Sequence, residues 1–182
     1  MAEKITDRDG IVFVLGGDGS IEEGSFYENL LNSKTWELPL IFIIENNEWS
    51  LGTHISERSC PINLEKLVGS FDIPYIKLEG NKVEDYLNKL MEAKAEVTKR
   101  KTPICIEVLV KTLGDRHADD GHYINYHAGA SPVVDLIKHS ESGGILKEST
   151  DDPLFVIQNE IGKDKLIEMS YRLVDEIKKE IQ

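Results

Sequence analysis

Two short polar motifs contain the residue types in this sequence that could do chemistry. They are Gly17-Asp18-Gly19-Ser20 and Glu45-Asn46-Asn47, and each directly follows an apolar run. Magnesium prefers oxygen ligands and often holds phosphate oxygens at the same time. Asp18 offers a charged oxygen and Asn47 a neutral one, and the small residues after Asp18 let backbone amides approach a phosphate. Together the motifs favour a site for a divalent ion and a diphosphate over a pair of structural turns.

Each motif is weak evidence when it is taken alone. Asp-Gly is a common turn dipeptide, and paired asparagines are also frequent in loops. The first motif is not a dinucleotide-binding fingerprint either, because Glu22 stands where the third glycine of that pattern belongs. The combination gains its specificity from the strands that precede both motifs.

A parallel sheet would bring the two motifs together. The apolar runs at residues 11–15 and 40–44 predict strands that are buried on both faces, and residues 22–34 predict the connecting helix. Strands joined by such a crossover end at the same edge of a sheet, where folds of this kind bind their ligands. We therefore expect Asp18 and Asn47 to lie at one edge.

The sequence after the second motif continues to alternate between helix and strand patterns. It predicts a short helix capped by Asn63 and ending near Phe71, a strand at 73–78, a helix at 83–100 and a strand at 103–110. Its proline places the strand at 73–78 near a sheet edge. The alternation predicts an α/β fold with a mostly parallel sheet and helices on both faces. We expect one domain over residues 1–182, ending in a helical segment at 150–182 whose last helix covers 163–181.

The composition excludes several classes of function. The chain has 182 residues and a formal net charge of −12, which argues against nucleic acid as a partner. The first ten residues lack an apolar signal region, and no stretch approaches the roughly 20 apolar residues of a membrane span. Cys60 and Cys105 form neither a metal-binding spacing nor a disulfide framework. We expect a cytoplasmic protein without a membrane or nucleic-acid partner.

Residues 111–132 interrupt the regular pattern and contain three histidines. They are His117, His122 and His127. A loop of this length is uncommon unless it is functional or disordered, and an imidazole suits proton transfer near neutral pH. His117 and His127 are competing candidates for a catalytic residue, with a solvated polar loop as the alternative. Zinc binding is disfavoured because a spacing of five residues fits no known ligand pattern. We expect His54 and His139 to be surface residues.

The segments around the two motifs carry a family resemblance. Between the motifs lie Gly24-Ser25-Phe26-Tyr27-Glu28-Asn29-Leu30 and Leu38-Pro39-Leu40-Ile41-Phe42. With the motifs, they resemble the thiamine diphosphate motif in α subunits of 2-oxo acid dehydrogenases of the pyruvate, branched-chain and acetoin type. The resemblance is strongest over residues 9–53 and looser towards the C-terminus. A weaker similarity to transketolase accompanies it.

The resemblance implies roles for particular residues. The side chains of Asp18 and Asn47 and the carbonyl of Trp49 would bind Mg²⁺, and the amides of Gly19 and Ser20 would hold the diphosphate of thiamine diphosphate. His117, followed by two aspartates, is similar to the catalytic histidine of the family's active-site loop. His127 is instead similar to a transketolase histidine that faces the substrate.

The resemblance also implies a function and partners. The chain would be a subunit of an enzyme that decarboxylates a 2-oxo acid and passes on the acyl group. Transketolase-type ketol transfer and a non-catalytic assembly subunit are the alternatives. The family's α subunits carry about as much sequence again before Asp18, so the resemblance implies a fold without its N-terminal part and with an unpaired sheet edge. The expected partners are a chain with that missing half, a β-type subunit that supplies the activating glutamate, and a lipoyl-bearing acyltransferase.

Overall fold

The computed structural model describes residues 10–50, 53–111 and 141–181, except for the side chain of Ile181. These residues belong to two compact units. The first unit comprises residues 1–79 and 84–110, and the second comprises 80–83 and 111–182. The expectation of one domain over 1–182 stays a prediction.

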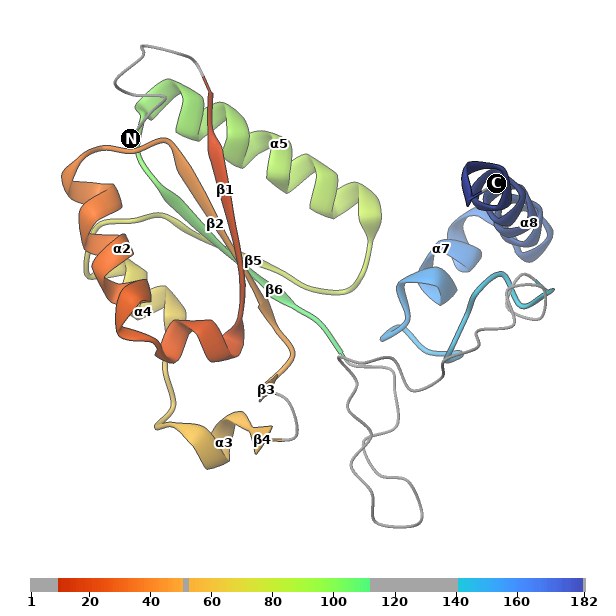
Figure 1. Cartoon of the computed structure of the whole chain (residues 1–182), viewed down its shortest axis with the longest axis horizontal. Helices are drawn as coiled ribbons and strands as arrows, with labels where there is room; N and C mark the ends of the chain where they lie inside the picture. The colour runs from red at the N-terminus through yellow and green to blue at the C-terminus, as the bar shows by residue number, and fades with distance from the viewer. Residues whose placement is uncertain (1–9, 51–52, 112–140, 182) are drawn as a thin grey trace. The chain divides into compact units, whose positions relative to one another are not determined.

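The first unit is built on a four-stranded parallel sheet (Figure 1). Its strands, in spatial order, are β1 (Val12–Gly17), β2 (Leu40–Asn46), β6 (Ile104–Leu109) and β5 (Tyr75–Leu78). Such strands need crossover connections, and the helices between them supply these. The predicted α/β class with a mostly parallel sheet is confirmed.

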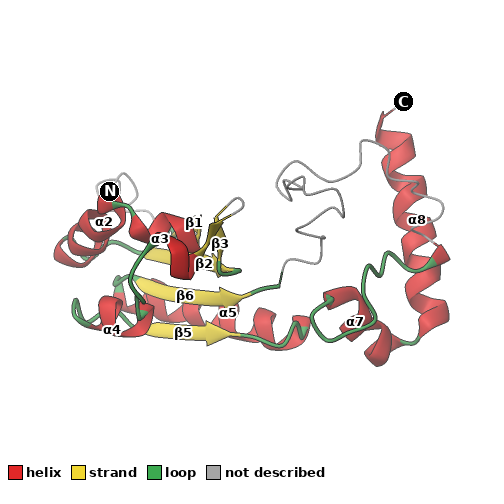
Figure 2. Ribbon diagram, turned by 90° about the horizontal axis from the view of Figure 1, so that it is seen from below, coloured by secondary structure: helices red, strands yellow, loops and turns green. Residues whose placement is uncertain are grey.

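Helices cover both faces of this sheet (Figure 2). Helices α2 (Gly24–Thr35) and α4 (Leu64–Gly69) bury Leu30 and Val68 against Phe42 and its neighbours on one face. Helix α5 (Val83–Arg100) buries Val97 against Ile41 and its neighbours on the other face. Successive residues of β2 thus pack into the cores on opposite faces of the sheet, because side chains alternate between the two faces along a strand.

Several element ends differ from the prediction in an instructive way. The helix expected at 22–34 is a short 3₁₀ helix, η1 (Asp18–Glu22), followed by α2, because the chain turns sharply at the end of β1. Strand β5 begins at Tyr75 instead of residue 73, since Pro74 has no N–H for the ladder. It lies at an edge of the sheet, as predicted. The cap of α4 is confirmed, because Asn63 Oδ1 accepts a hydrogen bond of 2.8 Å from the amide of Lys66.

The prediction that the first strand is buried on both faces is wrong. Strand β1 is the edge strand opposite β5, and Phe13 and Leu15 are 48% and 72% exposed. Val12 and Val14 are also exposed. An apolar run predicts that a strand will be covered, but it does not say which part of the molecule covers it. Within the part of the chain that the structure describes, no strand pairs with the outer side of β1, as the expected unpaired sheet edge requires.

A small substructure follows β2 at the carboxyl end of the sheet. Strands β3 (Trp49–Ser50) and β4 (Thr53–His54) form an antiparallel pair, and helix α3 (Ile55–Arg58) begins directly afterwards. His54 caps α3, because its ring accepts a hydrogen bond from the amide of Ser56 while Glu57 accepts one from the His54 amide. His54, expected to be a surface residue, is partly exposed, and its side chain also organises this turn.

The second unit contains α7 (Pro153–Ile161) and α8 (Lys163–Ile181) packed on each other. The predicted helix at 163–181 is confirmed. The polar segment before α7 is organised by Asp152, which is buried and accepts hydrogen bonds from the amides of Leu146, Lys147 and Leu154. In the described residues, no helix has the length and apolarity to cross a membrane.

Candidate metal and cofactor site

Asp18 is a charged side chain placed inside the protein. It is the first residue of η1, directly after β1, and it is 2% exposed. Moving a carboxylate out of water costs several kcal/mol unless a partner of opposite charge compensates for the loss of hydration. The neighbours of Asp18 therefore decide what this position can do.

Arg58, at the end of α3, is the partner of Asp18. Its Nη2 lies 2.5 Å from Asp18 Oδ2, and its Nη1 lies 2.8 Å from Glu22 Oε1. The hydroxyl of Ser59 donates to the same Glu22 oxygen at 3.1 Å. We call Asp18, Glu22, Arg58 and Ser59 the charged cluster. It joins η1 to α3 through two carboxylates and one guanidinium.

The backbone at Gly19 passes close to its neighbours. A Cβ added at Gly19 would lie 3.0 Å from Ser50 Oγ and 3.3 Å from Arg58 Nη1. A side chain would therefore crowd both β3 and the charged cluster. Ser20 donates from its hydroxyl to the carbonyl of Gly17 at 2.6 Å, which tightens the turn from β1 into η1. In the 3₁₀ helix η1, the amide of Gly19 precedes the first hydrogen bond of the helix and has no partner within it, so it suits an anion.

The second motif is held by a different set of side chains. Asn46 donates from Nδ2 to Glu107 Oε1 at 2.7 Å, and the Tyr75 hydroxyl donates to the other oxygen of Glu107. We call Asn46, Glu107 and Tyr75 the Glu107 cluster. Burial, and then the hydrogen bond to Glu107 and its charge, raise the pKa of Tyr75 well above its usual value. The cluster links the carboxyl end of β2 to β6 and to the first residue of β5.

Asn47 and Trp49 follow directly after this cluster. The Asn46 side chain accepts a hydrogen bond from the amide of Glu48, and Asn47 Oδ1 accepts one of 2.9 Å from the amide of Trp49. An amide oxygen has two lone pairs, and this residue type is a suitable neutral ligand for a cation. The rings of Trp49 and His54 pack edge to face, and their centroids lie 5.0 Å apart. These contacts fix the turn that presents Asn47 and Trp49.

The structure brings the two motifs to the same edge of the sheet. Gly17 pairs with Glu45 across β1 and β2, so both motifs begin at the same level. Helix η1 also contacts β2 and β3. The expected placement of Asp18 and Asn47 at one strand end is therefore confirmed, while their roles as ligands stay predictions.

The predicted histidines lie elsewhere in the chain. His117, His122, His127 and His139 are outside the described residues. The choice between His117 and His127 as a catalytic residue therefore stays a prediction, as does the zinc alternative.

Sequence reasoning missed the residues that surround Asp18 and Asn47. Arg58 is 40 positions from Asp18, and Glu107 is 61 positions from Asn46. Glu22 begins the helix predicted over residues 22–34, and that pattern gives it no further role. No local periodicity marks a long-range ion pair, so one sequence contains no signal for Arg58. For Glu107, its place as a charged residue within an apolar strand was an available signal.

The chemistry of the donor set fits a cation at Asp18. The described residues contain no group of three or more histidine, cysteine or acidic side chains that could hold a metal. Magnesium does not need one, because it usually takes one or two protein carboxylates and completes its shell with phosphate oxygens and water. Asp18 already carries a cation, the Arg58 guanidinium, at ion-pair distance. The residues present therefore fit Mg²⁺ held together with a diphosphate.

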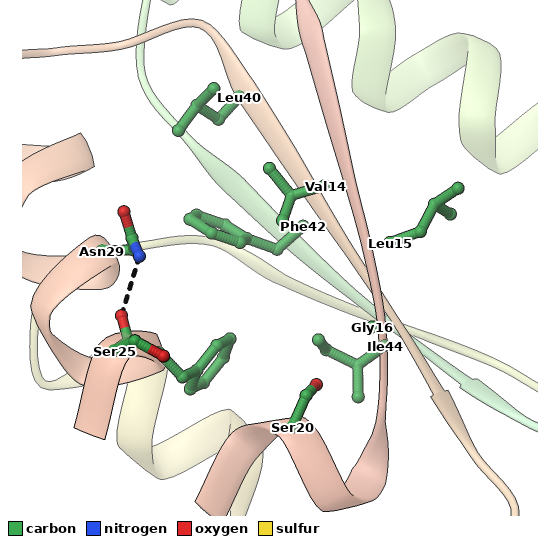
Figure 3. Close-up of a pocket in the computed structure, with 10 residues that line it drawn as sticks. Val14, Leu15, Gly16, Ser20, Ser25, Asn29, Leu40, Phe42 and Ile44 are labelled. Carbon is green, nitrogen blue, oxygen red and sulfur yellow. Dashed lines mark hydrogen bonds between the residues drawn. The ribbon is translucent and has the colours of Figure 1, made fainter. Parts of the chain in front are cut away.

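An apolar groove of about 250 Å³ lies between β1, β2 and α2 (Figure 3). Val14, Phe42 and Ile44 line it from the sheet, and Phe26 and Asn29 line it from α2. The groove borders the exposed strand β1 and is distinct from the charged cluster. It extends the apolar surface of β1 onto the face of the sheet that α2 covers.

Comparison with solved structures defines the class of fold. The chain is similar to the transketolase from Campylobacter jejuni, with a TM-score of 0.56, 18% identity, and coverage of 87% of this chain and 26% of the other. The transketolase from Leishmania mexicana gives a TM-score of 0.53 at 19% identity, covering 91% of this chain and 24% of the other. At such low identities these similarities establish the fold alone.

Sequence comparison defines the family. The model of the family described as "Dehydrogenase E1 component" matches residues 1–124, and the chain belongs to this family. It is 29% identical over 180 residues to the pyruvate dehydrogenase E1 component subunit alpha of Rickettsia conorii, covering 98% of this chain and 51% of that protein. The Rickettsia typhi protein of the same name is 31% identical, covering 80% of this chain and 43% of the relative. The chain thus spans about half the length of the curated relatives that it matches.

Proposed function

We propose that this chain carries the metal and diphosphate part of a thiamine diphosphate site. It would act within an α-type subunit of a 2-oxo acid dehydrogenase. Membership of the dehydrogenase E1 component family supports this proposal. The observation that carries it is the buried carboxylate of Asp18, which has a cation beside it at the strand end shared by both polar motifs.

Each residue of the two motifs has a defined task in this proposal. Asp18 supplies a charged ligand to Mg²⁺, and the Asn47 side-chain oxygen and the Trp49 carbonyl supply neutral ones. The amides of Gly19 and Ser20 hold the diphosphate. When bound, thiamine diphosphate supplies the chemistry that removes carbon dioxide from a 2-oxo acid and carries the acyl group to its acceptor. The residues of this chain bind and orient it.

The loop histidines complete the proposal. A protonated imidazole of His117 or His127 would donate a proton to, or hydrogen-bond, the oxygen of the substrate's keto group. Histidine suits this task because its ordinary pKa lies near neutral pH. Replacing each histidine in turn by glutamine would show which of them the reaction requires.

The exposed strand β1 supports a partner chain. Phe13 and Leu15 are exposed, and the adjoining groove is apolar, which is a hazard in an isolated protein. We propose that a chain with the remaining part of the family fold covers this edge. A β-type subunit would supply the activating glutamate, and a lipoyl-bearing acyltransferase would accept the acyl group.

Calorimetric titration with thiamine diphosphate tests the proposal. It uses the full chain with any subunit that copurifies, in Mg²⁺ and in EDTA. We expect binding in Mg²⁺ only, and we expect Asp18→Asn to weaken it by roughly 100-fold or more because the charged ligand is lost. Asp85→Asn, at an exposed position in α5, is the matched control and should bind like the wild type. Equal affinity of the wild type and Asp18→Asn would contradict the proposal.

Substrate assays separate this function from its alternatives. We expect turnover of 2-oxo acids by the assembled protein, whereas turnover of sugar phosphates would indicate transketolase-type ketol transfer. A non-catalytic assembly subunit would leave the activity of the complex unchanged when Asp18 is replaced.

A further inference from the structure

We infer that Arg58 is an internal counter-cation of Asp18 and that a divalent ion must displace it to bind. The ion pair and the metal would be mutually exclusive states of the same carboxylate. This inference rests on the proposed function, because it concerns the metal that Asp18 would hold. It adds a residue that sets the affinity of the site and lies outside both sequence motifs.

The geometry makes the two states compete. Arg58 Nη2 lies 2.5 Å from Asp18 Oδ2, and the side chains are 12% and 2% exposed. A magnesium ion bound to a carboxylate oxygen lies about 2.1 Å from it. A guanidinium already in contact with that oxygen takes up the same space. Two cations this close would also repel each other strongly, since the buried site offers little water to screen them.

Glu22 would keep an ion pair with Arg58 after the guanidinium leaves Asp18. Its Oε1 lies 2.8 Å from Arg58 Nη1, on the other arm of the guanidinium. Arg58 can therefore release Asp18 and keep one carboxylate partner, and it avoids the cost of a buried unpaired charge. Ser59 donates to the same Glu22 oxygen and keeps that carboxylate oriented towards α3.

The present arrangement does not satisfy Arg58 completely. Among the described residues, its Nε is a buried donor without a hydrogen-bond partner. A buried donor without a partner has lost its hydrogen bonds to water and gained none in return, which lowers stability. The position in which Arg58 pairs with Asp18 therefore leaves one of its donors unsatisfied. A shift of the guanidinium away from Asp18 changes the surroundings of Nε as well, and this provides a spectroscopic reporter for the displacement.

Titration with Mn²⁺ in the presence of thiamine diphosphate, followed by electron paramagnetic resonance, tests the inference. It uses the full chain with any copurifying subunit. We expect Arg58→Gln to bind Mn²⁺ more tightly than the wild type, by roughly 10-fold, because the competing cation is gone. Arg100→Gln is the matched control. Arg100 forms an exposed ion pair with Glu96 at the end of α5 and belongs to neither polar motif. It should bind like the wild type.

The outcomes separate the two proposals. If the wild type binds Mn²⁺ through Asp18 but Arg58→Gln binds equally or more weakly, this inference is wrong and the proposed function stands. If Asp18→Asn binds Mn²⁺ as tightly as the wild type, both are overturned. Tighter binding by Arg58→Gln, with binding lost in Asp18→Asn, supports both.

Nitrogen-15 NMR of arginine side chains follows the displacement in the wild-type protein itself, and a variant is needed only to assign the signal. The Nε–H signal of Arg58 is assigned in the wild type by its loss in Arg58→Lys. We expect it to shift when Mg²⁺ and thiamine diphosphate are added, while the Arg100 signal stays in place. An Arg58 signal that does not move while the ligands bind would overturn the inference.

Discussion

The charged cluster and the Glu107 cluster both contain carboxylates that adjoin one of the two polar motifs, but these carboxylates have different partners. Asp18 and Glu22 are held by the guanidinium of Arg58. Glu107 is held by two neutral donors, the amide of Asn46 and the hydroxyl of Tyr75. A carboxylate paired with a cation can exchange it for another cation. A carboxylate held by neutral hydrogen bonds has no such competitor and serves as a fixed support.

This comparison assigns different tasks to the two clusters. The charged cluster is the part of the site that changes when a metal binds. The Glu107 cluster holds the end of β2 in place, so that Asn47 and Trp49 follow in a defined turn. Substitutions in each cluster test this division of tasks.

Removing Arg58 should destabilise the metal-free protein strongly. Arg58→Gln leaves Asp18 as an uncompensated buried charge, so we expect a loss of about 3–5 kcal/mol in the free energy of unfolding. Urea denaturation measures this loss. Arg100→Gln breaks an exposed pair, with side chains 64% and 41% exposed, and should cost less than about 1 kcal/mol. Mg²⁺ with thiamine diphosphate should stabilise Arg58→Gln more than the wild type. A cost as small as that of the control would show that the charged cluster is not a buried ion pair in solution.

Removing Glu107 should have an intermediate effect of a different kind. Glu107→Ala leaves Asn46 and Tyr75 without their shared acceptor, so we expect a loss of about 2 kcal/mol in stability. Mn²⁺ binding should weaken by about 10-fold, because the turn that presents Asn47 is less well held. Glu79→Ala, which removes an exposed pair with Lys77, is the control. If the Mn²⁺ affinity of Glu107→Ala equals that of this control, the supporting role of the Glu107 cluster is refuted.

The hydroxyl of Tyr75 should make stability depend on alkaline pH. The folded protein raises the pKa of Tyr75 from 10.0, so the protonated hydroxyl stabilises the fold fully below pH 10. This contribution is lost as the pH rises above that value, because the unfolded chain releases the proton first. Below pH 10, Tyr75→Phe should therefore cost about 1 kcal/mol, and its deficit should shrink above pH 10. Urea denaturation at pH 8 and pH 10.5 measures both values. The exposed Tyr171 of α8 provides the control variant Tyr171→Phe, and a Tyr75→Phe deficit that does not change with pH would contradict the prediction.

The two cysteines report on the two clusters without changing them. Cys60 is exposed and lies two residues after Arg58, whereas Cys105 is buried and pairs with Tyr75 in the sheet register. Burial, and then the charge of Glu107, raise the pKa of Cys105 to about 12. A thiol reagent should label Cys60 at once and Cys105 only when the sheet unfolds. Glu107→Ala should speed the labelling of Cys105, while Arg100→Gln should not. Equal labelling of both thiols in the native protein would be the contrary result.

The regular elements of this chain were predictable because their determinants are local. The apolar spacing within residues 83–100 and 163–181 predicts α5 and α8, and the Asn63 side chain marks the start of α4. Two apolar runs, each followed by a polar motif, also predict that Asp18 and Asn47 share one sheet edge. In each case the residues that determine the structure lie in the same helix or strand as the predicted feature, or directly next to it in sequence.

The contents of the site were less predictable because they depend on distant residues. The pairing of Asp18 with Arg58 needs α3 to fold back towards η1, and a local pattern cannot show this. The exposure of β1 is the same kind of failure, since an apolar run indicates that a strand needs cover and does not identify the cover. The close approach of the Gly19 backbone to Ser50 likewise involves a residue from another element.

Anomalous scattering from bound Mn²⁺ is the most direct test of the central claim, that Asp18 holds a divalent ion together with a diphosphate. Crystals of the full chain, with any copurifying subunit, would be grown with Mn²⁺ and thiamine diphosphate. We expect an anomalous peak about 2.1 Å from an Asp18 carboxylate oxygen and next to the diphosphate, with Arg58 moved off Asp18 and still paired with Glu22. A metal and diphosphate bound elsewhere, while Asp18 keeps its ion pair with Arg58, would contradict the account.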